Sequence, residues 1–254
     1  MLAARLFHRY QSGPWLVWLH GLLGDSTEWL PIINQLKDYP SLALDLPGHG
    51  QSVNISCTGF APVSSLINAT LAQYQIEDYY LIGYSLGGRL AMYHACYSRP
   101  SGLKGLIIEG GNVGLTDLSE KRQRSINDHY WAERFRHQPF SQVLDDWYRQ
   151  AVFSQLNDQQ RQQLIALRSH NNPQAIADML EATSLAQQPF MADKLQRIDC
   201  PLLYLCGEHD QKFRRLAQQY ALPMDLIPEA GHNAHQASPN AFADAIHQFL
   251  SHCG

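Results

Sequence analysis

The segment Gly83–Gly87 has the sequence Gly-Tyr-Ser-Leu-Gly, with Ser85 at its centre. An apolar run, 79–82, precedes it, and a run with helical spacing, 89–95, follows it. Gly-x-Ser-x-Gly between a strand and a helix is the pattern of a nucleophile elbow, a tight turn that exposes the serine hydroxyl. The start of the helix also favours negative charge that develops beside the serine. The pattern therefore predicts that Ser85 takes part in catalysis.

A serine hydroxyl needs a histidine to accept its proton and a carboxylate to orient that histidine. With a nucleophile elbow, the acid and then the histidine follow the serine along the chain. Asp210 follows an expected strand at 201–206, and His232 follows another at 224–227. We therefore predict a triad of Ser85, Asp210 and His232. The weaker alternatives for the acid and the base are Glu208, His209 and His235.

A negatively charged oxygen that forms on the substrate needs hydrogen-bond donors, and the removal of one donor typically slows catalysis by about 100- to 1000-fold. The backbone N–H of Leu86 directly follows Ser85, and the turn at His20-Gly21 leads to the N–H of Leu22. Backbone donors tolerate varied side chains, so leucine fits both positions. We predict an oxyanion hole formed by Leu22 and Leu86; the alternative is that His20-Gly21 is only a tight turn.

Arg89 lies four residues after Ser85, which places it one helical turn away on the same face. Arginine binds carboxylates through paired hydrogen bonds, so this position favours an anionic substrate. Arg124 and Arg168, in a polar helical stretch, are further candidates for carboxylate binding. Three other arginines of that stretch are expected in solvated ion pairs: Arg122, Arg134 and Arg136.

These residues require a sheet that brings them to one edge. Short apolar runs that alternate with helical spacing predict a mostly parallel sheet with helices on both faces. The expected strands are 15–19, 42–44, 79–82, 103–108, 201–206 and 224–227, and further helices are expected at 26–36, 60–74 and 242–250. Ligands of such sheets bind beyond the carboxyl ends of the strands, where His20, Ser85 and Glu109 fall.

From about residue 119 to residue 195 the chain is rich in Gln, Arg, Asp and aromatic residues at helical spacing, with no convincing strand. We interpret this stretch as an all-helical cap over the sheet. The expected organisation is a core of residues 1–111 and 196–254 with a cap of residues 112–195. Trp147 and Tyr148 are expected either to pack the cap onto the sheet or to line the pocket.

The 254 residues are 45% hydrophobic, enough for a sizeable core, and the net charge is −4 with no long basic stretch. Nucleic acid is therefore not an expected partner. No apolar stretch approaches the roughly 20 residues that span a bilayer, and the N-terminus lacks a secretory apolar segment, so no membrane partner is expected. The five cysteines form no Cys-x-x-Cys pair, which favours reduced thiols and a cytoplasmic protein. No cluster with metal-ligand spacing is visible.

The chain resembles the 2-succinyl-6-hydroxy-2,4-cyclohexadiene-1-carboxylate (SHCHC) synthase family of menaquinone biosynthesis over nearly its full length. Motifs shared by many α/β-hydrolase enzymes occur at 19–25, 45–50, 83–88 and 108–111. Further matching segments are 205–210 and 231–235, and more specific to the family are Arg89 and the cap segments 167–172 and 179–186.

The resemblance implies an α/β-hydrolase fold and a lyase that eliminates pyruvate from an enolpyruvyl-bearing cyclohexene, without a metal or an organic cofactor. It implies a Ser85-His232-Asp210 triad, three carboxylate-binding arginines and three aromatic residues near the pocket. The arginines and aromatic residues so implied are Arg89, Arg124, Arg168, Tyr84, Trp147 and Tyr148.

The expected partner is thus a small polycarboxylate substrate, with Ser85 as the base that removes a proton from carbon. The main alternative is an ester or carbon–carbon bond hydrolase with the same triad, because fold alone does not separate these activities. A non-catalytic receptor for a small anion is a third class. It predicts tight binding without turnover, and the presence of Ser85, Asp210 and His232 together argues against it.

Overall fold

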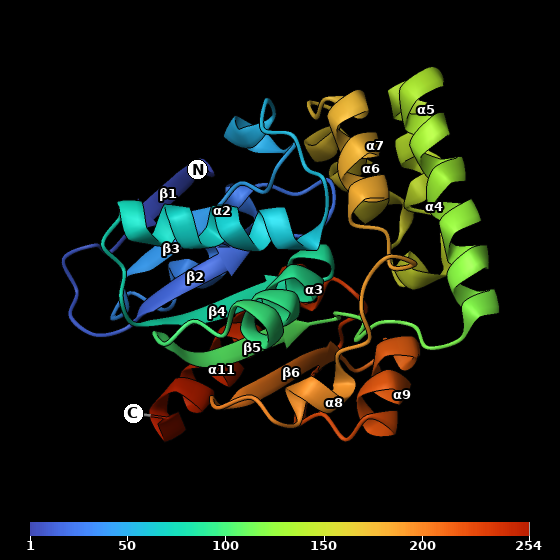
Figure 1. Ribbon diagram of the computed structural model, residues 1–254. Helices are drawn as coiled ribbons and strands as arrows, with labels where there is room; N and C mark the ends of the chain where they lie inside the picture. Colours follow the sequence, from blue (N-terminus) through green and yellow to red (C-terminus); the bar gives the residue numbers. More distant parts are fainter. Residues whose placement is uncertain (254) are drawn as a thin grey trace.

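The computed structural model describes residues 1–253 and contains a seven-stranded sheet with helices on both faces (Figure 1). The strand order is β1-β3-β2-β4-β5-β6-β7, and every neighbouring pair is parallel except β1 with β3. The strands are β1 (Ala4–Phe7), β2 (Trp15–Leu19), β3 (Ser41–Leu44), β4 (Tyr79–Tyr84), β5 (Leu103–Glu109), β6 (Leu202–Gly207) and β7 (Met224–Ile227). The predicted mostly parallel α/β architecture is confirmed.

The helices fall into two groups, one around the sheet and one inserted between β5 and β6. Around the sheet lie α1 (Leu30–Ile33), α2 (Phe60–Gln73), α3 (Leu86–Tyr93), α9 (Gln211–Gln219), α10 (Ala234–Ala237) and α11 (Pro239–Cys253). The inserted helices are α4 (Leu118–His137), α5 (Phe140–Trp147), α6 (Asp158–Arg168), α7 (Pro173–Ala182) and α8 (Ala192–Leu195).

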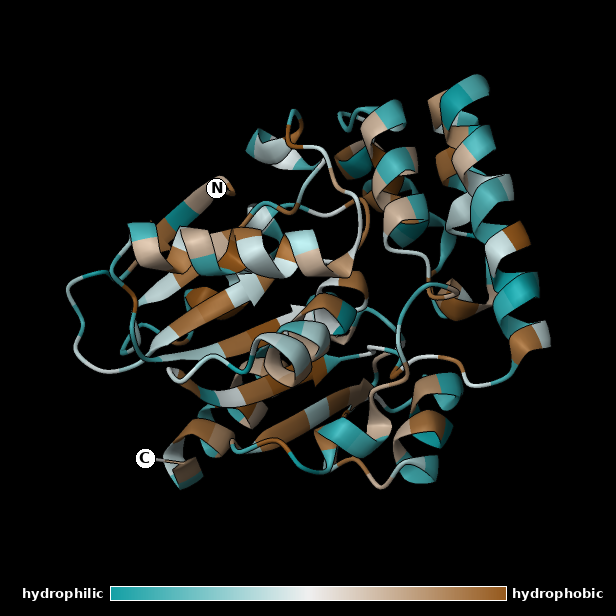
Figure 2. Cartoon of the chain, viewed as in Figure 1, coloured by the Kyte–Doolittle hydropathy of each residue, from teal (hydrophilic) through white to brown (hydrophobic). Residues whose placement is uncertain are grey.

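The sheet is apolar on both faces, and each face is covered by helices. In β2, Leu16 and Trp18 pack with α1 and α11, whereas Val17 and Leu19 pack with α2 and α3. A strand with apolar side chains on both faces must be covered on both, as in other parallel sheets with crossover helices. Figure 2 shows the mostly apolar strands lying between these helices.

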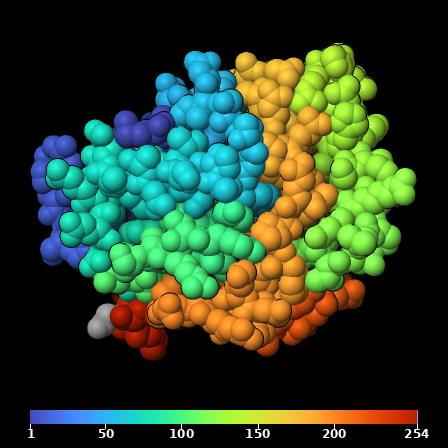
Figure 3. Space-filling view, viewed as in Figure 1, coloured from blue at the N-terminus to red at the C-terminus, as the bar shows by residue number. Residues whose placement is uncertain are grey.

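Residues 112–195, which we call the cap segment, contain no strand. Helices α4 to α7 stand beyond the carboxyl ends of the strands, and the chain after α7 returns along the surface of the core (Figures 1 and 3). These helices bury an apolar cluster of their own that includes Trp131, Phe135 and Leu144 and also contains Leu23 of the core. The last part of the segment, α8, instead packs into the apolar cluster of the core.

Three local features differ from the sequence-based expectation. Strand β1 was not expected, because its four residues show little alternation of polar and apolar side chains. Two of them are exposed at the sheet edge. Helix α9 was also not expected. The expected helix at 26–36 is a 3-10 turn, Ser26–Trp29, followed by the short α1. Pro31 has no N–H to donate to Thr27, and the N–H of Leu30 bonds to the Thr27 carbonyl instead.

No helix within residues 1–253 combines the length and the apolar composition needed to cross a membrane.

Candidate active site

Ser85 occupies a strained turn between β4 and α3. Its backbone has φ 50° and ψ −105°, a conformation that residues other than glycine rarely adopt. Its N–H donates to the carbonyl of Glu109 at 2.8 Å, which ties the turn to β5. A Cβ on Gly87 would lie 2.2 Å from the carbonyl oxygen of Leu19, and one on Gly83 would lie 2.5 Å from that of Gly87. The flanking glycines are therefore required by close backbone approach.

The structure brings the three predicted triad residues together. His232 Nδ1 lies 2.8 Å from Asp210 Oδ2, and His232 Nε2 lies 3.4 Å from Ser85 Oγ. The second distance exceeds that of a tight hydrogen bond, as is common for such pairs before substrate binds. Asp210 and His232 are each only 7% exposed. Asp210 also caps α9, since its Oδ1 accepts the N–H of Phe213 at 3.3 Å.

The alternative residues lie elsewhere. Glu208 is exposed and accepts the N–H of Glu229 at 3.1 Å. His209 is exposed, with its side chain free of hydrogen bonds among residues 1–253. His235 is fully buried, and its Nδ1 lies 2.7 Å from Glu109 Oε2. Only His232 therefore has an imidazole in hydrogen-bonding contact with Ser85.

Aromatic rings hold the His232 imidazole in place. Phe213 stacks on it with ring centres 4.8 Å apart and an angle of 21° between planes. Tyr84 packs on it at 5.3 Å, and Phe153 of the cap segment approaches it edge-on at 6.0 Å. Sequence reasoning missed Phe213 and Phe153. The signal for Phe213 was its place three residues after Asp210, which puts it within the first turn of the helix that this aspartate caps.

The backbone N–H groups of Leu22 and Leu86 have no acceptor among residues 1–253. The turn that contains Leu22 packs directly on the elbow, because a Cβ on Gly21 would lie 2.7 Å from the Tyr84 ring and 3.7 Å from Ser85 Cβ. Two unengaged donors thus accompany Ser85, as an oxyanion hole requires.

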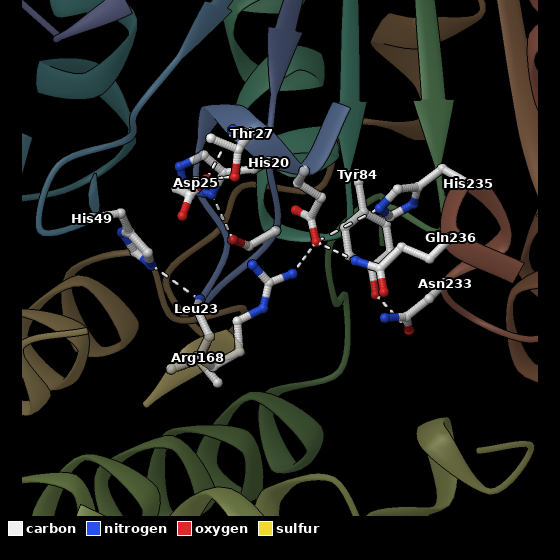
Figure 4. Close-up of polar contacts among 12 residues, drawn as sticks. His20, Leu23, Asp25, Thr27, His49, Tyr84, Arg168, Asn233, His235 and Gln236 are labelled. Carbon is white, nitrogen blue, oxygen red and sulfur yellow. Dashed lines mark hydrogen bonds and ion pairs between the residues drawn. The ribbon is translucent and has the colours of Figure 1, made fainter. Parts of the chain in front are cut away.

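Two buried histidines hold the turn 20–24 in place (Figure 4). His20 Nδ1 lies 2.7 Å from the carbonyl of Gly21, and its Nε2 accepts the N–H of Leu46 at 3.0 Å. His49 Nε2 accepts the N–H of Leu23 at 3.1 Å. Burial lowers the pKa of His20, and it lowers that of His49 to about 3, so both rings are neutral and can accept these bonds. Their role is to orient the backbone that presents the N–H of Leu22.

Arg89 is buried between α3 and the end of the cap segment. Its Nη1 donates to the carbonyl of Thr183 at 2.7 Å and to Gln188 Oε1 at 3.3 Å. Its guanidinium also lies 5.7 Å from the centre of the Phe60 ring. Burial, followed by the positive charge of Arg124, lowers the pKa of Arg89 to about 9. Within residues 1–253, no carboxylate forms an ion pair with this cation.

Arg124 and Arg168 both have acidic partners. Arg124 Nε donates to Asp128 at 2.7 Å within α4 and remains partly exposed. Arg168, at the end of α6, is 3% exposed and pairs with Glu28 of the core. Its Nε–H has no hydrogen-bond partner. The structure therefore places Arg89 and Arg124 within electrostatic reach of each other and uses Arg168 to join the cap segment to the core.

Glu28 is a buried acid that sequence reasoning missed. Besides Arg168, it accepts the side-chain N–H of Gln236 at 2.7 Å and lies 3.6 Å from His235 Nε2. Three side chains labelled in Figure 4, Arg168, His235 and Gln236, thus converge on this carboxylate. Burial alone would raise the pKa of Glu28, but the charge of Arg168 and the contact with His235 hold it well below its usual range. The cluster has no sequence signature, since Glu28 and Arg168 are 140 residues apart.

The three predicted aromatic residues occupy different places. Tyr84 is buried beside the triad and donates its hydroxyl to Asn233 Oδ1 at 2.9 Å. Tyr148 is buried against Phe153 and lies close to Arg168. Trp147 packs edge-on against Trp131 within the cap segment, with ring centres 5.1 Å apart. These contacts lie within the cap segment itself and do not decide between the two roles expected for Trp147, which were packing of the cap onto the sheet and lining of the pocket.

Among residues 1–253, no three His, Cys, Asp or Glu side chains are grouped so that they could hold a metal ion. A cavity of about 370 Å³ adjoins the triad and includes Asp210 and His232 in its lining. A larger one, about 670 Å³, is lined by core residues such as Cys96 and Cys200 and by the end of the cap segment, and contains no triad residue. Size alone therefore does not identify the site.

The family described as alpha/beta hydrolase fold matches residues 14–239. Proteins named 2-succinyl-6-hydroxy-2,4-cyclohexadiene-1-carboxylate synthase from Yersinia pseudotuberculosis serotype O:1b (strain IP 31758) and Yersinia pestis (strain Pestoides F) are similar to this chain. Each is 56% identical to it over 240 residues, which cover 94% of this chain and 88% of the relative.

Two solved structures share the fold. The structure of MenH from S. aureus matches with a TM-score of 0.91 at 28% identity and covers 100% of this chain and 99% of that chain. A malate-bound thermophilic esterase from Thermogutta terrifontis matches with a TM-score of 0.82 at 22% identity, over 99% of this chain and 93% of that chain, which is a likeness of fold alone. On the family match and the identity to the Yersinia proteins, the chain belongs to the SHCHC synthase family, within the α/β-hydrolase fold.

Proposed function

We propose that this protein eliminates pyruvate from 2-succinyl-5-enolpyruvyl-6-hydroxy-3-cyclohexene-1-carboxylate and so forms SHCHC in menaquinone biosynthesis. The identity to proteins named SHCHC synthase supports this reaction. The structural observation that supports it most is Arg89, a buried cation one helical turn after Ser85 whose hydrogen bonds go only to neutral acceptors. A buried charge without an opposite charge is unfavourable, so the position suits a site that receives a carboxylate.

The proposed reaction begins with proton abstraction. Ser85 Oγ passes its proton to His232 Nε2 and takes the proton from the carbon next to the succinyl carbonyl, while Asp210 stabilises the imidazolium. The carbonyl oxygen becomes an enolate oxygen and accepts hydrogen bonds from the N–H groups of Leu22 and Leu86. A positioned base of this kind contributes roughly 100- to 10,000-fold.

Pyruvate then leaves. The electron pair of the enolate returns through the ring and breaks the bond between the ring carbon and the enolpyruvyl oxygen. The leaving group departs as the enolate of pyruvate and takes the proton held by His232, while Ser85 keeps the proton that came from carbon. Both groups thus return to their starting protonation states, and no water, metal or redox partner is consumed.

The substrate carries carboxylates on its succinyl, ring and enolpyruvyl groups, and we propose that Arg89, Arg124 and Arg168 bind them. Arg89 offers guanidinium N–H groups beyond those used by Thr183 and Gln188. Arg168 would act through its unengaged Nε–H, since its Nη2 is paired with Glu28. Tyr84 and Tyr148 would border the same pocket, and residues 112–195 would form its cap.

We further propose that the enzyme works in the cytoplasm. Its cysteines are all free thiols, including the half-buried Cys57, Cys200 and Cys253, a state that a reducing compartment maintains.

The test is product analysis with the purified protein and the enolpyruvyl precursor. The proposal expects pyruvate and the conjugated diene chromophore to form in equal amounts, without oxygen from isotopically labelled water in either product. Ser85→Ala serves as the control for catalysis by this site. Release of an acid and an alcohol, with labelled oxygen incorporated, would instead establish a hydrolase.

A further inference from the structure

A cation with no part in the scheme above, Lys212, lies beside the triad. Its Nζ is 5.2 Å from the centre of the Phe213 ring, and the same ring stacks on the imidazole of His232 at 4.8 Å. The Phe213 ring therefore contacts both the ammonium group and the catalytic imidazole. Lys212 comes two residues after Asp210, in the first turn of α9, so the helix that carries the triad acid also carries this cation.

Lys212 also lines the cavity of about 370 Å³ that adjoins the triad. Asp210 and His232 form one part of its wall, and Val152 and Gln155 of the cap segment form another. The cavity thus lies between the core and the cap segment, on the side of the triad formed by Asp210 and His232. The Lys212 side chain is exposed, so its ammonium group is accessible to a ligand that enters there.

The charges around Lys212 are unbalanced. Among residues 1–253, no acid forms an ion pair with its Nζ. Partial enclosure, followed by the positive charge of Arg124, lowers the pKa of Lys212, although the charge of Asp210 opposes this. Arg124 has the same effect on Arg89. The charge of Arg124 therefore acts on two other cations, one on α3 and one on α9.

The acids near these cations are already engaged. Asp128 accepts hydrogen bonds from Arg124 and from the hydroxyl of Ser184 at 2.7 Å each. Asp210 is hydrogen-bonded to His232 and caps its helix. Like charges held near each other repel unless an anion lies between them, and among residues 1–253 no carboxylate forms an ion pair with both Arg124 and Lys212.

We propose that Lys212 and Arg124 together bind one carboxylate of the substrate, which makes Lys212 a specificity-determining residue of the reaction proposed above. A lysine suits this position because its ammonium is a compact charge on a flexible stem that can follow a moving carboxylate. A neutral ester would leave Lys212 without an anionic partner, so this position selects for polycarboxylates.

The first experiment compares Lys212→Gln and Lys212→Arg with the wild type in the pyruvate-release assay. Lys212→Gln should lower kcat/KM by roughly 10- to 100-fold, mainly through KM, because a charge-assisted hydrogen bond to substrate is lost. Lys212→Arg should recover most of that loss. The matched control is Lys194→Gln, since Lys194 Nζ also lies over a ring, 5.0 Å from the centre of Tyr97, but lines the other cavity. Unchanged kinetics for Lys212→Gln would overturn the proposal.

The second experiment tests whether the two cations share one carboxylate. Lys212→Gln is measured both in the wild type and in the Arg124→Gln variant. The factor by which it lowers kcat/KM should differ at least about threefold between these two backgrounds, because the effects of residues that act on one group are not additive. If Lys212→Gln lowers kcat/KM by the same factor in both backgrounds, the two cations bind separate groups and the shared site is refuted.

Calorimetric titration with succinate gives a readout that does not require turnover. Succinate should bind the wild type and Lys194→Gln more tightly than Lys212→Gln, and equal affinities, or no binding to the wild type, would count against an anion site at Lys212. A wild type that releases no pyruvate would overturn the proposed function, and the succinate titration would still decide the role of Lys212.

Discussion

Replacement of Arg89 by methionine should separate the stability of the site from its activity. The pKa of Arg89 is lowered from its ordinary value of 12.5 to about 9. At 1.36 kcal/mol for each pKa unit, the folded protein therefore disfavours the charged guanidinium by roughly 5 kcal/mol. The hydrogen bonds to Thr183 and Gln188 offset about 1.5–3 kcal/mol each. Methionine removes both contributions, so the free energy of unfolding should lie between about 1 kcal/mol below and about 2 kcal/mol above that of the wild type.

The same substitution should severely reduce activity. Loss of one partner of a buried, hydrogen-bonded charge pair costs about 2–5 kcal/mol, which is roughly 30- to 5,000-fold in kcat/KM. Urea unfolding gives the stability, and pyruvate release gives the kinetics. Arg149→Met is the control, because Arg149 is exposed and pairs only with Asp145 on the surface of the cap segment. A loss of more than about 3 kcal/mol in stability would show that Arg89 is structural, and an unchanged kcat/KM would remove it from the site.

Three further predictions concern the triad and the buried acids. Ser85→Ala should lower turnover by about 10⁴-fold or more while circular dichroism shows a folded protein; near-normal turnover would exclude it as the base. Asp210→Asn should lower kcat by about 10⁴-fold, whereas Glu208→Gln should change it little, and the reverse ranking in the same assay would assign the wrong acid. Burial disfavours the charged form of His235, but Glu109 and, after it, Glu28 raise its pKa to about 9, above the 6.5 of the unfolded chain. Its contribution of about 3 kcal/mol is therefore complete below pH 6.5 and is lost as pH rises through 9. Glu109→Gln should reduce this loss in urea unfolding, with Glu28 left to act on His235, and equal pH slopes would refute the assignment.

Much of the fold could be predicted because its strands are apolar on both faces and its glycine-rich turns follow them. Residues 15–19 and 79–82 were expected as strands and lie in β2 and β4. Strand β1 could not be predicted, since it is a short edge strand whose pairing with β3 supplies its hydrogen bonds. The residue types of β1 do not indicate that it pairs with β3.

The roles of the two nearby histidines could be ranked only by their place in the chain. His232 and His235 both follow β7, three residues apart. In the folded protein one faces Asp210 and Ser85, while the other is buried against Glu109. The difference arises because the chain turns at Asn233 into α10 and brings the second imidazole to Tyr84 and Glu109, at the ends of β4 and β5.

The sequence by itself determined the elbow at Ser85, the order of the triad and the presence of arginines suited to carboxylates, because local backbone geometry and residue chemistry need only neighbours in the chain. Only the tertiary structure decided which cations have acidic partners. Arg168 meets Glu28 across 140 residues of chain and is neutralised, whereas Arg89 meets only a carbonyl and an amide. Charge balance at a site depends on distances through space, and these are set when the cap segment packs against the core.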